Sequence, residues 1–144
     1  MSSSDGLGRA VAATLAAEGA RVVISGRDRA KLERVGAEVG AVAWPAGDLT
    51  EEGSPEQVVN EAVAFLGGLD VLVVNTGGGK PGGIADVTGA QEEAAYRSML
   101  RPALAMARAA RPALQASGDG RCYARVRVSP SVARHRPMRQ ARAR

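Results

Sequence analysis

The regular alternation of short apolar runs with longer helical patterns is the feature that most constrains the fold. Apolar runs typical of strands occur at 21–25, 41–44 and 69–74, and they alternate with helical patterns at 9–18, 29–39, 54–66 and 90–116. Strands that alternate with helices form parallel sheets, because each helix returns the chain to the start of the next strand. We therefore predict an α/β fold with a three-layer parallel sheet. Pro102 and Pro112 are expected to kink or break the last helix.

Local signals mark the ends of the earlier helices. Gly19 and Gly40 follow helical patterns and are expected to end them in a left-handed conformation. Asp28 is predicted to cap the helix at 29–39. Ser54 is predicted to cap the next helix, where Gln57 would complete a capping box.

A glycine turn precedes the first helical pattern and consists of Ser3, Ser4, Asp5, Gly6, Leu7 and Gly8. Glycines let the backbone approach a phosphate closely, and the free N–H groups at a helix N-terminus attract negative charge. Such a turn normally follows a strand, and no apolar run precedes it here. We therefore expect a dinucleotide site on a Rossmann-like sheet that is incomplete because its first strand is missing.

Arg27 follows the apolar run at 21–25 and bears on the choice of cofactor. In dinucleotide-binding folds, the end of the second strand contacts the adenosine ribose. An acidic residue there favours NAD, whereas an arginine accommodates the 2′-phosphate of NADP. Arg27 therefore favours NADP, and NAD stays open as the alternative.

Three motifs in order and at the right spacing resemble the short-chain dehydrogenase/reductase family. They are Gly6-Leu7-Gly8, Asp48-Leu49-Thr50 and Asn75-Thr76-Gly77-Gly78. Thr76, and Met99 at the position of the family's helix asparagine, resemble a divergent branch that is similar to 3-oxoacyl-acyl-carrier-protein reductases. The resemblance implies an NADP(H)-dependent oxidoreductase of the carbonyl reductase or alcohol dehydrogenase type, acting on a small-molecule substrate.

The resemblance also implies a set of cofactor-binding residues. Gly6 and Gly8 would face the pyrophosphate, Asp48 would bond the adenine amino group, and Leu49 would line the adenine pocket. The full set is Ser3, Ser4, Asp5, Gly6, Leu7, Gly8, Arg27, Asp48, Leu49, Asn75, Thr76 and Gly77. An alternative stays open for each of them, since Asp48 could cap a turn and glycines could serve a turn with positive φ.

The catalytic groups implied by the resemblance are mostly absent. Relatives use a serine and a Tyr-x-x-x-Lys pair, in which the tyrosine acts as general acid and the lysine lowers its pKa. Neither Tyr96 nor Tyr123 is followed by lysine four residues on, and the only lysines are Lys31 and Lys80. Ser129 is the candidate for the catalytic serine, with poorly matching surroundings. We expect weak cofactor binding and no turnover.

The charge is divided unevenly along the 144 residues. The segment 121–144 holds eight of the 19 basic residues and no acidic one, which leaves 11 basic and 15 acidic residues in 1–120, a net charge of −4. We expect a partial dinucleotide-binding domain at 1–120 and an Arg-rich tail at 121–144. Burying arginines in a sheet centre is costly, so the run at 121–128 either lies at an exposed edge or is not the fifth strand that the family resemblance implies.

Two interpretations of the tail remain. The favoured one is a disordered or frameshifted end, with the chain truncated at both ends relative to the family. The alternative is a non-enzymatic protein, either a basic-tailed nucleic-acid binder or a pseudoenzyme that acts through subunit contacts.

Composition restricts the remaining classes. A single cysteine, Cys122, excludes an intrachain disulfide and favours the cytoplasm. No apolar run has the length of a membrane span, so no membrane partner is expected. His135 is the only histidine and has no ligand-like neighbours, so we expect no metal site. The helical pattern at 90–116 neither requires nor excludes a homo-oligomer.

Overall fold

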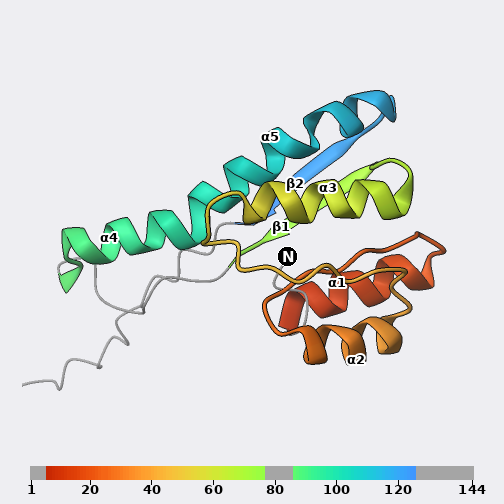
Figure 1. Ribbon diagram of the computed structural model, residues 1–144, viewed down its shortest axis with the longest axis horizontal. Coiled ribbons are helices and arrows are strands. Elements are labelled where there is room, and N and C mark those ends of the chain that lie inside the picture. Colours follow the sequence, from red (N-terminus) through yellow and green to blue (C-terminus); the bar gives the residue numbers. More distant parts are fainter. Residues whose placement is uncertain (1–5, 77–85, 126–144) are drawn as a thin grey trace, which may run out of the picture.

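The computed structural model describes residues 6–76 and 86–125, in which helices alternate with extended segments (Figure 1). The elements are α1 (Gly6–Ala17), α2 (Arg29–Val39), α3 (Ser54–Leu66), β1 (Val71–Asn75), α4 (Gly89–Ala95), the π-helical turn η2 (Tyr96–Leu100), α5 (Arg101–Ala116) and β2 (Arg121–Arg125). The predicted helices are confirmed. The fold is Rossmann-like α/β with a small parallel sheet.

Parallel pairing occurs at two places. β1 and β2 pair in parallel, with Val71 opposite Arg121 and Asn75 opposite Arg125. The predicted strands at 21–25 and 41–44 also lie parallel, but isolated bridges rather than a continuous ladder connect them. In the part of the chain that the structure describes, each of these two segments pairs along one edge only.

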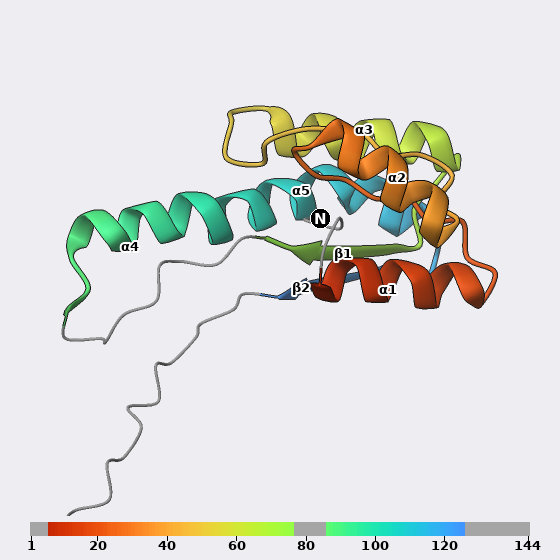
Figure 2. The same ribbon diagram turned by 90° about the horizontal axis from the view of Figure 1, so that it is seen from below.

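Two separate hydrophobic clusters hold the elements together. The first joins α3, β1 and α5, with the buried residues Val58, Val59, Leu69, Leu72, Val74, Ala103, Met106 and Ala110. The second joins α1, α2 and the extended segment after α1, with Ala12, Val22, Ile24, Leu32, Val35 and Val39. α5 lies on one side of β1 and α1 on the other (Figure 2). The molecule therefore has helices on both sides of its sheet, as a three-layer fold requires.

The ends of α1 and α2 follow the sequence signals. Gly19 has φ of 85° after α1, and Gly40 has φ of 71° after α2, where its N–H donates to Gly36 O. At the start of α2, the carboxylate of Asp28 accepts a hydrogen bond from the backbone N–H of Lys31 at 3.0 Å. Asp28 is therefore a helix cap, as predicted.

The start of α3 differs from the prediction. The N-cap is Gly53 with φ of 78°, and no side chain caps the helix. Ser54 is already the first helical residue, so its predicted capping role is wrong. Gln57 donates instead to the carboxylate of Glu61, one turn further on, at 2.9 Å. A glycine in the left-handed region gives the chain an entry angle that a capping serine in the extended region could not.

The two prolines in the last helical pattern act differently. Before Pro102 the helix widens into η2, where the N–H of Arg101 donates to Tyr96 O, five residues back. A π-helical turn of this kind changes the helix locally without ending it. Pro112 lies inside α5, which continues to Ala116, so of the two effects predicted there, a kink or a break, the break does not occur.

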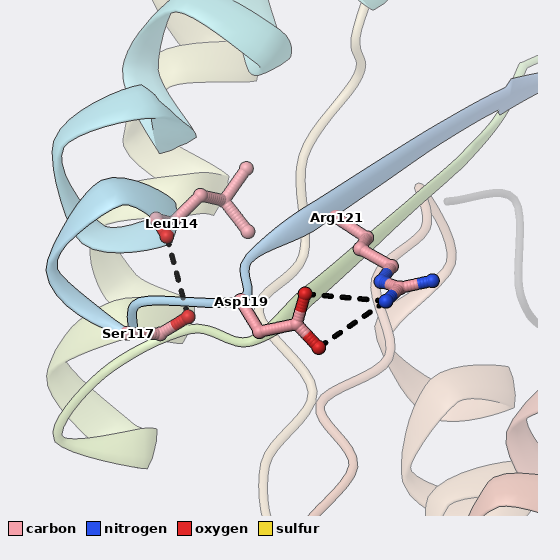
Figure 3. A network of polar contacts seen from close by, with 4 residues as sticks. All are labelled: Leu114, Ser117, Asp119 and Arg121. Atoms are coloured by element: carbon pink, nitrogen blue, oxygen red, sulfur yellow. Dashed lines mark hydrogen bonds and ion pairs between the residues drawn. The ribbon is translucent and has the colours of Figure 1, made fainter.

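A tight turn connects α5 to β2 (Figure 3). The hydroxyl of Ser117 donates to Leu114 O at 3.2 Å, and the guanidinium of Arg121 donates to both carboxylate oxygens of Asp119 at 3.2 Å. A Cβ at Gly120 would collide with the backbone of Leu114, so only glycine fits there. β2 is exposed at all five positions. The described part of the run at 121–128 is thus an exposed strand paired with β1.

Candidate nucleotide-binding site

One edge of the molecule gathers the predicted cofactor-binding residues that the structure describes. β1 ends at Asn75, and α1, α2 and α3 begin, on the same side of the fold (Figures 1 and 2). In open parallel sheets, ligands bind outside the carboxyl ends of the strands. The topology therefore places the candidate site at this edge, between the start of α1 and the loops that follow the extended segments.

The start of α1 has the features expected of an anion-binding turn. Gly6 has φ of 52°, a left-handed conformation that favours glycine, and Gly8 is buried. Leu7 is exposed, and the first turn of the helix carries no acidic side chain. The first N–H groups of a helix have no partner within it, so they are suited to a phosphate. Ser3, Ser4 and Asp5 lie outside the described residues.

The structure brings Arg27 and Asp48 together. The N–H of Gly47 donates to Gly26 O at 2.9 Å, which joins the two loops directly before these residues. Nη1 of Arg27 lies 3.9 Å from Oδ2 of Asp48, in an ion pair. The Arg27 side chain is 79% exposed and that of Asp48 34%. Most of the guanidinium is therefore accessible to a ligand.

Thr50 holds the other oxygen of Asp48. Oδ1 of Asp48 accepts hydrogen bonds from the backbone N–H of Thr50 at 2.9 Å and from its hydroxyl at 2.8 Å. These two bonds hold the pKa of the Asp48 carboxyl below its ordinary value of 3.8, while burial opposes them and the attraction of Arg27 adds least. Thr50 was not among the predicted site residues. The Asp-x-Thr spacing, which is typical of a side chain that bonds the backbone two residues on, could have indicated it.

Leu49 and Thr76 make contacts within the protein. Leu49 is partly buried against the cluster of α3, β1 and α5. The hydroxyl of Thr76 donates to Met99 O at 3.4 Å, which ties the end of β1 to η2. Asn75 is half-buried at the end of β1, and Gly77 lies outside the described residues. Packing accounts for Leu49 and Thr76 at least in part, and the cofactor roles of all four stay predictions.

The two tyrosines of the chain both lie on the surface. Tyr96 lies exposed on η2, and Tyr123 lies exposed on β2. Ser129 and Lys80 lie outside the described residues. Within 6–76 and 86–125, no group of three His, Cys, Asp or Glu side chains could hold a metal ion. In the same ranges, no helix combines the length and the apolar character needed to span a bilayer.

A family model for short chain dehydrogenases matches residues 1–136. The chain belongs to the short-chain dehydrogenase family. A putative ketoacyl reductase of the granaticin polyketide synthase from Streptomyces violaceoruber is 38% identical over 99 residues, which cover 68% of this chain and 39% of that protein. A glucose 1-dehydrogenase from Gluconobacter oxydans is 38% identical over 79 residues, which cover 51% of this chain and 30% of that protein.

Two solved structures have the same fold. A 3-ketoacyl-ACP reductase from Sinorhizobium meliloti superposes with a TM-score of 0.74 and 30% identity, covering 83% of this chain and 49% of that one. An alcohol dehydrogenase from the archaeon Thermococcus sibiricus gives a TM-score of 0.75 at 22% identity, covering 83% of this chain and 53% of that one. The chain thus spans about half the length of these structures and less than half that of the curated relatives above.

Proposed function

We propose that this chain is the nucleotide-binding part of an NADP(H)-dependent oxidoreductase that acts on a small-molecule carbonyl or alcohol. The observation that carries the proposal is the exposed guanidinium of Arg27, held beside Asp48 at the carboxyl edge of the fold. A cation at the end of the second strand is the feature that accommodates a 2′-phosphate. Members of the family bind NAD(P), and Arg27 favours NADP.

The residues at this edge fit the adenosine half of the cofactor. Gly6 and Gly8 at the start of α1 would hold the pyrophosphate, since the first helical turn carries no acidic side chain to repel it. Arg27 would bind the 2′-phosphate through charge-assisted hydrogen bonds. Asp48 would contact the adenine amino group. When bound, the cofactor supplies or accepts hydride at its nicotinamide ring.

The nicotinamide half has no matching general acid in this chain. The 144 residues contain no Tyr-x-x-x-Lys pair. We therefore propose that the chain binds cofactor weakly and does not turn over by itself. The ketoacyl reductase among its relatives supports a carbonyl substrate. Purified chain that oxidised NADPH with carbonyl substrates at an ordinary enzymatic rate would contradict this part of the proposal.

Binding of NADPH and NADH to the purified chain tests the cofactor assignment. We expect Arg27→Ala to weaken NADPH about tenfold, the equivalent of one charge-assisted hydrogen bond at an exposed site, and to leave NADH unchanged. Arg97→Ala is a matched control, because Arg97 is also exposed and paired with one carboxylate but lies on η2. Equal losses for both nucleotides, or binding of neither by the unmodified chain, would contradict the assignment.

Two finer proposals concern location and assembly. We propose a cytoplasmic location, because the single cysteine, Cys122, is free. We also propose a homo-oligomer through the rod formed by α4, η2 and α5. Tyr96, Leu100 and Leu104 are exposed at intervals of four residues there, which places them along one side of the rod. Light scattering of the purified chain measures the oligomeric state, and a monomer at micromolar concentration would contradict the second proposal.

A further inference from the structure

The bridge between the loops after Gly26 and Ala46 fixes the separation of Arg27 from Asp48. Gly26 and Ala46 form a parallel bridge, and the N–H of Gly47 donates to Gly26 O at 2.9 Å. A Cβ at Gly47 would lie 2.7 Å from Oγ of Ser54 and 3.0 Å from Cγ2 of Val58, so the start of α3 packs closely on this loop. The bridge and this packing hold the backbone directly before Asp48.

Rotation of the Asp48 side chain is restricted by Thr50. Both bonds from Thr50 go to the same oxygen, Oδ1, at 2.9 Å from the N–H and 2.8 Å from the hydroxyl. The other oxygen, Oδ2, is the one that lies 3.9 Å from Nη1 of Arg27. The two oxygens of one carboxylate thus have separate partners, and the bonds to Oδ1 determine where Oδ2 points.

The carboxylate of Asp48 is the charged partner of Arg27. Its side chain is 79% exposed, so packing restrains it little. Within the described residues, Asp48 is the one carboxylate that forms an ion pair with Arg27. A long, exposed side chain without an anchor samples many rotamers, and a ligand must then order it on binding.

Thr50 has no visible packing role that would compete with this interpretation. Its side chain is exposed, and its hydroxyl donates to Oδ1 of Asp48 at 2.8 Å. An exposed threonine could be replaced by valine with little change in shape. A loss on removing the hydroxyl would therefore come from the bond itself.

We propose that Thr50 is a positioning residue for cofactor selection: it holds Oδ1 of Asp48 so that Oδ2 stays turned to Arg27, which keeps the guanidinium where a 2′-phosphate would bind. This inference rests on the proposed function. It assigns part of the preference for NADP to a hydroxyl that does not touch the cofactor. Arg27 supplies the charge, and Thr50, through Asp48, supplies its placement.

The test compares Thr50→Val with Thr50→Ser in the full chain. We expect Thr50→Val to raise the dissociation constant for NADPH about three- to tenfold, the cost of ordering one long side chain on binding, and to change that for NADH less. Thr50→Ser, which keeps the hydroxyl, should behave as the unmodified chain. Thr14→Val is the control, because it removes another exposed hydroxyl bond, to Ala10 O in α1. An equal loss for both nucleotides, or no rescue by serine, would overturn the inference.

A second measurement needs no nucleotide. The bond from the backbone N–H of Thr50 is the largest cause of the lowered pKa of Asp48, and the bond from its hydroxyl is the second. Thr50→Val keeps the first bond and removes the second, so it should raise that pKa part of the way in the free protein, and Thr50→Ser should not. NMR titration of the Asp48 carboxyl carbon measures this directly. An unchanged pKa in Thr50→Val would refute the contact itself. If the pKa rises but the unmodified chain binds neither nucleotide, the proposed function fails while the positioning of Asp48 by Thr50 stands.

Discussion

In Gly36→Ala, the local effect and the tertiary effect on the free energy of unfolding have opposite signs. Gly36 lies inside α2 and is buried. In a helix interior, alanine is more favourable than glycine by about 1 kcal/mol, so helix propensity alone predicts a more stable protein. The ring of Trp44 lies directly over Gly36, however. A Cβ there would overlap Cε3 of Trp44 and would lie 3.0 Å from both Cδ2 and Cζ3.

The steric clash with Trp44 outweighs the gain in helix propensity, so the substitution should destabilise the protein. Overpacking of this kind costs about 1–3 kcal/mol, because the indole must leave its place in the cluster of α1 and α2. After the gain in propensity is subtracted, we expect Gly36→Ala to lower the free energy of unfolding by about 1 kcal/mol, or the melting temperature by about 3 °C for a chain of this size. Urea unfolding followed by circular dichroism measures the difference.

A double-mutant cycle separates the two effects. In a Trp44→Leu background the obstacle is smaller, so Gly36→Ala should become neutral or stabilising, and the coupling between the two sites should be about 1–2 kcal/mol. If Gly36→Ala stabilises the protein with Trp44 in place, and the two substitutions are additive, the proposed packing of the indole on α2 is wrong.

Three further substitutions test other contacts. Arg21→Met should lower the free energy of unfolding by about 1 kcal/mol, because it removes two hydrogen bonds, both 2.9 Å long, to the carbonyls of Phe65 and Leu66 at the end of α3. Arg21→Lys should lower it less. An unchanged urea midpoint in Arg21→Met would contradict a stabilising role for these two bonds. The carboxylate of Asp48 has a folded-state pKa below 3.8, so its stabilisation is fully present above that pH and is lost as the pH falls through the folded-state pKa. Asp48→Asn should therefore flatten the fall in stability below about pH 4, and parallel pH profiles for the two proteins would refute this. Thr88→Ala breaks the capping box of α4 and should cost about 1 kcal/mol of local stability, seen as faster amide exchange in α4 alone.

The parts of the fold that depend on neighbours in sequence could be predicted from the sequence. α2 runs from Arg29 to Val39 as expected, because Asp28 and Gly40 fix its ends through contacts within one turn. The run at 21–25 was predicted as a regular strand and forms isolated bridges, because a strand depends on partners far away in the chain. The capping role given to Ser54 is wrong because Gly53, with φ of 78°, takes the N-cap position, and the helix begins one residue earlier than predicted.

In the candidate site, too, the features fixed by neighbours in sequence could be predicted, and those that depend on distant residues could not. Arg27 and Asp48 were each predicted from their motifs, but their ion pair was not, because 21 positions separate them and only the bridge between Gly26 and Ala46 brings them together. Thr50 was missed although its bonds to Asp48 are local. The Asp-x-Thr spacing predicts a turn, and it gives no indication that the far oxygen of the carboxylate faces an arginine.

The two hydrophobic clusters share no buried residue, and this affects how the protein unfolds locally. In native-state hydrogen exchange, regions with separate cores behave as separate cooperative units, each with its own free energy of opening. The α1–α2 half should therefore exchange its amides at a different denaturant concentration from the α3–β1–α5 half. Arg21 lies directly before the extended segment of the first half and bonds the end of α3 in the second, so its two hydrogen bonds couple the opening of the two halves. A protease would accordingly release one half as a discrete fragment before the other is digested.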